Sequence, residues 1–217
     1  NSVIEGDMKI FVIPAGTESN NLLGEKTDPS INLKLVYIGR IDKKRGVEEL
    51  ISLSNALADS SVKHSLTVVG EGDMEDEMAR HSELSEFFCY MNKIPRDKIQ
   101  RILADNHIGI LPMPDIPVWR ISSPLKLAEY LAAGLLIVGP EHSGNQLKGS
   151  EDWDLLTLSG DWVNDSVTRI KLAMEEDWGR LSLSAIESSH HLHWENITKN
   201  VIQFIEEIER NQSNTMA

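Results

Sequence analysis

Residues 123–139 read SPLKLAEYLAAGLLIVG. The serine–proline pair that opens this stretch favours a helix N-terminus, and Gly134 is typical of the position that follows a helix. The apolar run after it predicts a short buried strand. Within the predicted helix, Lys126 and Glu129 are three residues apart and therefore lie on one face. A helix that leads directly into a buried strand indicates an α/β protein.

The same alternation of short apolar runs and stretches of helical periodicity extends along most of the chain. Strands are expected at residues 33–39, 64–70, 86–91, 107–113, 135–139 and 153–158, and helices at residues 46–57, 74–81, 96–105, 125–133 and 167–177. Continuous apolar strands joined by helices are typical of a parallel sheet with right-handed crossovers. We therefore predict a doubly wound, Rossmann-like fold with a parallel six-stranded sheet flanked by helices, followed by C-terminal helices.

The composition excludes several classes of protein. The 217 residues carry a net charge of −13, and this field repels nucleic acid and anionic lipid, so neither is expected as a partner. Cys89 is the single cysteine, which excludes a disulfide framework and favours a reducing compartment, the cytoplasm. The sequence has no apolar run of ~20 residues that could cross a membrane, and no signal peptide is recognised.

The first candidate ligand site is the basic turn GRIDKKRG, residues 39–46, at the end of the first predicted strand. Ligands of doubly wound sheets bind at the carboxyl ends of the strands. Four cations in six positions beside a helix N-terminus could bind an anion, and an arginine can hold a phosphate with two hydrogen bonds. The alternative is a solvated basic turn. These cations are Arg40, Lys43, Lys44 and Arg45.

The second candidate is the opening stretch itself, which follows the fourth predicted strand. Backbone N–H groups of Leu125 and Lys126 would face the ligand crevice, where the Lys126 charge and the helix dipole could neutralise a phosphate. The Glu129 carboxylate could then accept hydrogen bonds from two sugar hydroxyls. The alternative is an ion pair between Lys126 and Glu129, which contributes a few tenths of a kcal/mol. Only the nucleotide interpretation also accounts for the basic turn.

The other loops give weaker signals. GEGD, residues 70–73, lacks the third glycine of a dinucleotide fingerprint and is interpreted as a tight turn, so no NAD site is expected. Residues 91–96 could offer backbone groups and an apolar surface to a planar base. Residues 143–145 could bind a ligand or simply form a turn. His107 is expected to be a core histidine, and no metal site is expected among His190, His191 and His193.

Several blocks together resemble the C-terminal half of a GT-B glycosyltransferase of the family 4, or group 1, type. These blocks are LVYIGRIDKKRGVEELI, LTVVGEGDMEDEM and DNHIGILPMP followed by SSPLKLAEYLAAGLLIVG. VIPAGTESN near the start resembles the segment that leads into this half. WENITKNVIQFIEEI resembles the final helix of the family, which crosses back to the N-terminal domain.

The resemblance implies roles for individual residues. Arg40 and Arg45 match the family's cations for the donor diphosphate, although the second is usually a lysine. Glu129 matches the second glutamate of an E-x7-E motif, which binds the ribose, whereas Ile121 stands in place of the first. Implied diphosphate-binding residues are Gly39, Arg40, Arg45, Ser123, Pro124, Leu125 and Lys126, and implied base-binding residues are Asn92, Lys93 and Ile94.

The resemblance also implies a domain organisation and an activity. Residues 1–31 would be a linking segment, residues 32–178 the donor-binding domain, and residues 179–217 helices that cross back to an absent N-terminal domain. The implied activity is retaining transfer of a hexose from a nucleoside-diphosphate sugar to an unknown acceptor, without a metal or another cofactor. The isolated half would be inactive, and any peripheral membrane association would occur through the missing half. The alternatives are a non-catalytic scaffold or regulatory domain and half of a nucleotide-sugar epimerase.

Overall fold

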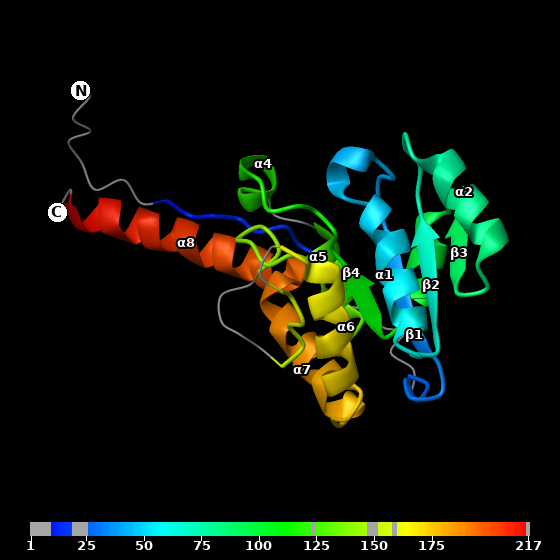
Figure 1. Cartoon of the computed structure of the whole chain (residues 1–217). Coiled ribbons are helices and arrows are strands. Elements are labelled where there is room, and N and C mark those ends of the chain that lie inside the picture. Colours follow the sequence, from blue (N-terminus) through cyan, green and yellow to red (C-terminus); the bar gives the residue numbers. More distant parts are fainter. Residues whose placement is uncertain (1–9, 19–25, 123–124, 147–151, 158–159, 216–217) are drawn as a thin grey trace.

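A computed structural model describes residues 10–18, 26–122, 125–146, 152–157 and 160–215. Its centre is a parallel five-stranded sheet in the order β3-β2-β1-β4-β5 (Figure 1). The strands are β1 (Leu33–Ile38), β2 (His64–Val69), β3 (Phe88–Met91), β4 (Ile108–Ile110) and β5 (Leu136–Val138). The helices are η1 (Lys43–Arg45), α1 (Glu48–Asp59), α2 (Glu75–Leu84), α3 (Arg96–Ala104), α4 (Pro117–Arg120), α5 (Leu125–Ala132), α6 (Trp162–Ala173), α7 (Trp178–Ser189), η2 (His190–Leu192) and α8 (Trp194–Thr215).

Helices cover the sheet in two layers, as the continuous apolar strands require. Helix α1 packs against α6, and α5 packs against α7. Helices α3 and α5 flank a common pocket and therefore lie next to each other. Strands β1, β4 and β5 are almost entirely buried, whereas in β3, at one edge of the sheet, only Phe88 is buried. The α/β architecture with a parallel sheet is confirmed.

The order of the strands creates a switch point between β1 and β4. The chain continues from β1 to β2 on one side of the sheet, whereas β4 and β5 lie on the other side. The ladder between β1 and β4 pairs Leu35 with Ile108 and Val36 with Gly109, and within the described chain it ends there. Parallel α/β sheets bind ligands in the crevice at such a point, outside the carboxyl ends of the strands.

Tyr130 of α5 completes the hydrogen bonding of β1 beyond this ladder. The Ile38 N–H donates to the Tyr130 hydroxyl oxygen at 2.9 Å. The tyrosine ring is buried against Gly109, where an added Cβ would lie 2.2 Å from a ring carbon. Helix α5 therefore sits directly on β4, and its N-terminal turn lies near the carboxyl end of that strand.

The sixth strand that we expected at residues 153–158 is not part of the sheet. Its described part, residues 153–157, joins β5 through isolated bridges that pair Ile137 with Asp154 and Pro140 with Thr157. Between these bridges lies Gly139, where an added Cβ would be 2.1 Å from the carbonyl oxygen of Leu111. The Thr157 N–H donates to the Gly139 carbonyl oxygen at 3.0 Å, so this segment lies beside β5, but the bridges remain isolated and the described sheet has five strands rather than six.

His107 is a core histidine, as expected, and all of its ring nitrogens are used. The Lys34 N–H donates to Nδ1 at 2.9 Å, and the carbonyl oxygen of Thr27 accepts from Nε2–H at 2.7 Å. This arrangement requires the neutral imidazole, since a carbonyl can only accept and a backbone N–H can only donate. Burial is the main cause that lowers the pKa of His107 to about 4.

The depressed pKa of His107 predicts a loss of stability in mild acid. The unfolded chain takes up this proton below a pKa of about 6.5, whereas the folded chain does not until about 4. The contribution is therefore present above pH 6.5 and is lost as the pH falls toward 4. We expect the free energy of unfolding, measured with urea, to decrease from pH 7 to pH 5. In His107→Gln the decrease should be shallower, and an equal slope in both proteins would contradict this assignment.

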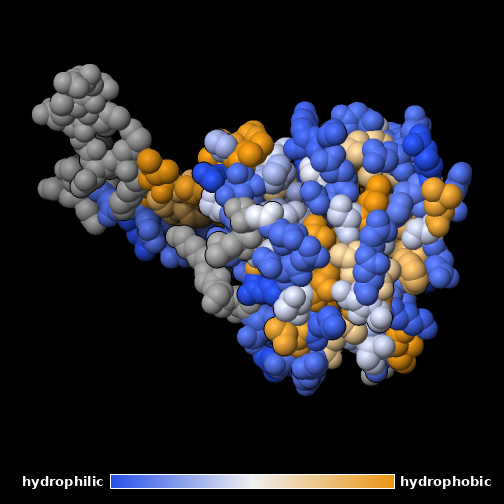
Figure 2. All heavy atoms as spheres, viewed as in Figure 1, coloured by the Kyte–Doolittle hydropathy of each residue, from blue (hydrophilic) through white to orange (hydrophobic). Residues whose placement is uncertain are grey.

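The N-terminal segment and α8 together form an arm that projects from the domain (Figure 1). Thr17 bridges to His193, and the Trp194 N–H donates to the Thr17 carbonyl oxygen at 3.0 Å. Farther out, the rings of Phe11 and Phe204 lie 5.2 Å apart. Hydrophobic side chains are visible on this arm beside charged ones (Figure 2). Within the described residues, no helix has the length and apolar character needed to cross a bilayer.

Candidate functional site

The basic turn, residues 39–46, leaves the carboxyl end of β1 and is anchored on both sides. The Ile41 N–H donates to the Glu71 carbonyl oxygen at 2.9 Å, which ties the turn to the end of β2. The Tyr37 hydroxyl donates to the Arg40 carbonyl oxygen at 2.7 Å, and burial raises the pKa of this hydroxyl. The backbone that carries the cations is therefore fixed before any ligand binds.

Asp42 organises the two arginines of the turn. Its carboxylate accepts from Arg40 Nη2 at 3.1 Å and from Arg40 Nε at 3.3 Å, and it lies 3.7 Å from Arg45 Nε. The Asp42 side chain is only 11% exposed, and the hydrogen bond from Arg40 lowers the pKa of the carboxyl. Sequence analysis assigned no role to Asp42, because the pattern of cations does not indicate which carboxylate orients them.

The two arginines differ in exposure. The Arg40 side chain is 60% exposed at the rim, whereas Arg45 is half-buried beneath Trp119 of α4. The Arg45 guanidinium carbon lies 4.9 Å from the centroid of the Trp119 ring. Lys43 is exposed and pairs with Glu48 at 3.4 Å. A phosphate at this turn would therefore meet one exposed cation and one half-buried cation.

The start of α5 carries the ion pair that sequence analysis proposed as the simpler alternative. Lys126 Nζ lies 2.5 Å from Glu129 Oε2, and the two side chains are 29% and 18% exposed. The pair is therefore close to the surface yet shielded enough to be ordered. Ser123 and Pro124, the expected helix cap, lie outside the described residues. Leu125 is the first residue of α5.

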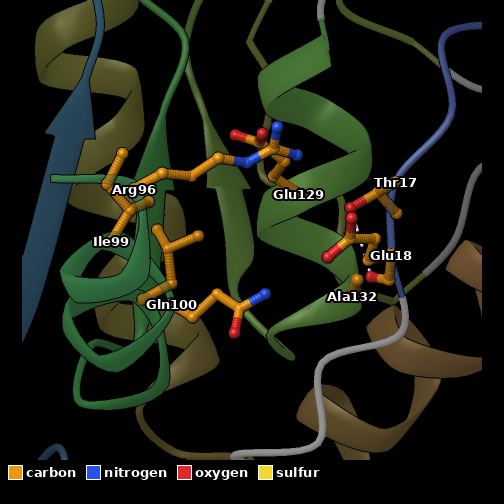
Figure 3. Close-up of a pocket in the computed structure, with 8 residues that line it drawn as sticks. Thr17, Glu18, Arg96, Ile99, Gln100, Glu129 and Ala132 are labelled. Carbon is orange, nitrogen blue, oxygen red and sulfur yellow. Dashed lines mark hydrogen bonds between the residues drawn. The ribbon is translucent and has the colours of Figure 1, made fainter.

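Glu129 also lines a small pocket between α3, α5 and the N-terminal segment (Figure 3). From the start of α3, Arg96 reaches toward Glu129, and Gln100 lies one turn below it (Figure 3). Thr17 and Glu18 close the pocket from the N-terminal segment. Sequence analysis did not identify Arg96, although its position just after the expected base-binding loop was an available signal.

The expected base-binding loop follows β3. Asn92 and Lys93 are exposed, Ile94 is half-buried, and the Lys93 N–H donates to Asn92 Oδ1 at 2.7 Å. Two strands, β2 and β1, separate β3 from β4 in the sheet. This loop leads directly into α3, however, so that Arg96 spans the distance between it and Glu129.

The loop after β4 contains the position where the family's first glutamate would fall. Ile121 is 86% exposed there. Asp115 instead accepts from Arg120 Nε at 2.6 Å and from Nη2 at 2.9 Å, and this hydrogen bonding lowers the pKa of the Asp115 carboxyl. Asp115, just before α4, is thus paired with Arg120, the last residue of α4.

Residues 143–145 and the GEGD turn, residues 70–73, both form hydrogen bonds that stabilise loops. Ser143 Oγ donates to the Arg120 carbonyl oxygen at 2.7 Å, and Asn145 Nδ2 donates to the carbonyl oxygens of Leu111 and Pro140. These residues hold the loop after β4. In the GEGD turn the Gly72 N–H donates to Glu75 Oε1 at 2.7 Å, which makes the turn a helix start, as expected.

The three C-terminal histidines, His190, His191 and His193, belong to the helical tail. They lie in and after η2, and the rings of His190 and His193 are 5.5 Å apart. Within the described part of the chain, no group of three or more histidine, cysteine, aspartate or glutamate side chains has the arrangement to hold a metal ion.

The parallel sheet and the loops at its switch point define a domain of the GT-B glycosyltransferase fold. A pneumococcal O-GlcNAc transferase, GtfA, solved in complex with UDP and GlcNAc, superimposes with a TM-score of 0.68 over 94% of this chain and 41% of its own, at 13% identity. WaaG, a glycosyltransferase involved in lipopolysaccharide biosynthesis, superimposes with a TM-score of 0.53 over 74% of this chain and 45% of its own, at 16% identity.

The chain belongs to the family described as glycosyl transferases group 1, whose family model matches residues 32–175. A curated relative, the amylovoran biosynthesis glycosyltransferase AmsK of Erwinia amylovora, is 26% identical over 116 residues, which cover 52% of this chain and 28% of AmsK. The chain therefore spans less than half the length of the relatives it matches.

Arg40→Ala tests the exposed cation of the basic turn. If Arg40 contacts a diphosphate, its removal takes away a charge-assisted hydrogen bond, and we expect nucleoside-diphosphate affinity to fall about tenfold. The melting temperature should change little, because Arg40 is exposed. Arg210→Ala on α8 is the control, since it removes an exposed cation far from the site. Equal affinities in the wild type and Arg40→Ala, measured by calorimetry, would make this a solvated turn.

Proposed function

We propose that this chain is the donor-binding half of a retaining glycosyltransferase that binds a nucleoside-diphosphate sugar. The observation that carries the proposal is that two charged elements follow neighbouring strands at one switch point. The basic turn follows β1, and the Lys126–Glu129 start of α5 lies beside the carboxyl end of β4, the strand next to β1. An ion pair alone gives no reason for the neighbouring cluster of cations.

In this proposal the cations hold the diphosphate. Arg45 is fixed and offers a planar set of donors, Arg40 closes from the rim, and Lys126 contributes a point charge. The N–H groups at the start of α5 add the positive end of a helix dipole. Gly39, Ser123, Pro124 and Leu125 belong to the same proposed site through the family resemblance.

Glu129 is proposed to bind the ribose. Its carboxylate can accept hydrogen bonds from two adjacent hydroxyls, while Lys126, 2.5 Å away, orients it. The base would lie over Asn92, Lys93 and Ile94, with Arg96 between base and ribose. This placement follows the path from the end of β3 to the pocket that Glu129 lines (Figure 3).

The chemistry is proposed to need no metal ion. Two arginines and a lysine supply the positive charge that a divalent cation would otherwise give a leaving diphosphate. In the full protein, transfer of a hexose should therefore persist in EDTA, and the product should keep the anomeric configuration of the donor. Loss of transfer in EDTA, or inversion at the anomeric carbon, would contradict these two parts of the proposal.

The rest of the protein is proposed to bind the acceptor and to pack on the projecting arm. Val12, Ile202 and Ile205 of this arm are exposed aliphatic residues, and an aliphatic surface of this kind is suited to contact with another domain. The isolated chain would then bind donor without transferring sugar. The single cysteine supports a cytoplasmic site for the reaction.

One observation favours a second candidate, a non-catalytic scaffold of the same fold. Ile121 cannot hydrogen-bond a sugar at the position where the family places a glutamate, and it is 86% exposed. A scaffold could retain nucleotide binding while lacking transfer. Transfer of sugar by the full-length protein would exclude it.

The test of the main proposal is calorimetry of this chain with UDP, GDP and ADP. UDP is the first choice because GtfA was solved with UDP. We expect one of the three to bind in the micromolar to millimolar range. If none binds at millimolar concentration, the donor-binding proposal is wrong.

A further inference from the structure

Trp119 contacts the basic turn through both its ring and its N–H group. The ring lies over the Arg45 guanidinium, whose carbon is 4.9 Å from the ring centroid. The indole Nε1–H donates to the Lys44 carbonyl oxygen at 3.2 Å. One side chain of the loop after β4 is therefore attached at two points to the turn after β1.

The backbone of Trp119 is held from the opposite side, by the loop after β5. An added Cβ on Gly144 would lie 1.9 Å from the Trp119 carbonyl oxygen, so that the two backbones are in direct contact. Ser143 Oγ donates to the neighbouring Arg120 carbonyl oxygen, and Ser122 Oγ donates to the Trp119 carbonyl oxygen, both at 2.7 Å. Helix α4 is thus a bridge between two loops, with its backbone fixed on one and its indole fixed on the other.

The Arg45 guanidinium lies against this bridge and has few other contacts of its own within the described part of the chain. Its Nε atom is buried and has no hydrogen-bond partner among the described residues, and Asp42 Oδ2, at 3.7 Å, is beyond hydrogen-bonding distance. A guanidinium stacked on an aromatic ring keeps the donors along its edge available for a planar anion. The indole of Trp119 therefore covers a guanidinium that Asp42 approaches without a hydrogen bond at Nε.

We propose that Trp119 is a positioning residue that holds the Arg45 guanidinium with its edge toward the donor diphosphate. This inference rests on the proposed function and adds a residue from α4 to the site. In this proposal the loops after β1, β4 and β5 are connected through α4. An aromatic side chain on α4 then sets the orientation of a phosphate-binding arginine. The alternative is that Trp119 only fills space, in which case Arg45 acts independently of it.

The test is a double-mutant cycle between Trp119→Leu and Arg45→Gln, read by calorimetry with the diphosphate that the wild type binds. We expect Trp119→Leu to weaken binding about five- to tenfold, in line with a partly desolvated cation–π contact. Trp119→Phe, which keeps an aromatic face and removes the N–H, should lose about twofold. In the Arg45→Gln background Trp119→Leu should change affinity less than about twofold, because the partner is already absent.

Leu183→Ala is the control, since Leu183 is an exposed apolar side chain on α7 and lines neither the basic turn nor the pocket of Glu129. It should bind diphosphate as the wild type does. Wild-type affinity in Trp119→Leu, or losses that simply add in the double variant, would overturn the inference.

A second readout needs no nucleotide. The ring current of Trp119 should shift the Nε–H resonance of Arg45 upfield in the wild type and in Trp119→Phe, and the shift should vanish in Trp119→Leu. An unchanged resonance in Trp119→Leu would overturn the inference even if nucleotide binds. If the resonance moves as expected but no nucleotide binds, the proposed function fails while the contact between Trp119 and Arg45 stands.

Discussion

Glu129→Gln is expected to weaken the binding of a nucleoside diphosphate about ten- to a hundredfold. Glutamine keeps the shape of the side chain but removes the charge and one acceptor, and hydrogen bonds to a charged acceptor contribute ~1.5–3 kcal/mol. Lys126, now 2.5 Å from the carboxylate, would also lose its partner. Calorimetry of the two proteins with the same nucleotide measures the difference.

The ion-pair alternative predicts a different result. If Glu129 interacts only with Lys126, its removal costs a few tenths of a kcal/mol of stability and leaves nucleotide affinity unchanged. Glu206→Gln is a matched control, because Glu206 forms an i,i+4 pair with Arg210 on α8, far from the site. Any effect common to both variants is a general effect of losing an exposed pair.

The nucleotide can be varied together with Glu129, so that protein and ligand changes form a thermodynamic cycle. A 2′-deoxy nucleotide lacks one of the two hydroxyls, so it should be less sensitive to Glu129→Gln than the ribonucleotide. If both ligands lose affinity by the same factor, Glu129 does not contact the 2′-hydroxyl. Its role would then be limited to the 3′-hydroxyl or to support of Lys126.

Gly70→Ala is expected to destabilise the fold by about 2–4 kcal/mol, one of the larger costs for a single substitution. Gly70 follows β2 directly and has a φ of +153°, and an added Cβ would lie 1.7 Å from the Gly39 carbonyl oxygen. Gly39 begins the basic turn, so the methyl group must displace the backbone that carries Arg40 and Arg45. Nucleotide affinity should therefore fall together with the free energy of unfolding.

Gly160→Ala separates the two causes of the lost stability, which are backbone strain at a positive φ and the clash of the added methyl group. Gly160 has a similar φ, +146°, but no atom of the described residues lies within 4 Å of an added Cβ. This variant should show only the backbone strain, about 1 kcal/mol, and should bind nucleotide normally. If Gly70→Ala cost no more than Gly160→Ala in urea denaturation, the close approach between β2 and the basic turn would be unimportant.

The sequence by itself determined the class of fold and the location of the charged loops. Apolar runs and helical periodicity are local properties of the chain, so the alternation of strands and helices could be predicted without knowing the contacts. The spacing of Lys126 and Glu129 likewise fixes their separation on a helix, and the structure confirms the pair at 2.5 Å. The sixth strand was predicted wrongly: residues 153–157 lie beside β5 but form only isolated bridges with it, and the extent of such pairing depends on contacts between segments rather than on local periodicity.

Only the tertiary structure decided which side chains act together at the switch point. Asp42 orients Arg40, Trp119 covers Arg45, and Arg96 reaches the pocket of Glu129. The last two of these contacts join loops or helices that follow different strands, and their geometry depends on the order of those strands in the sheet. A periodic pattern specifies the buried face of each element, but it does not specify which element becomes its neighbour. The charges of the site could therefore be predicted from the sequence, whereas their orientation could not.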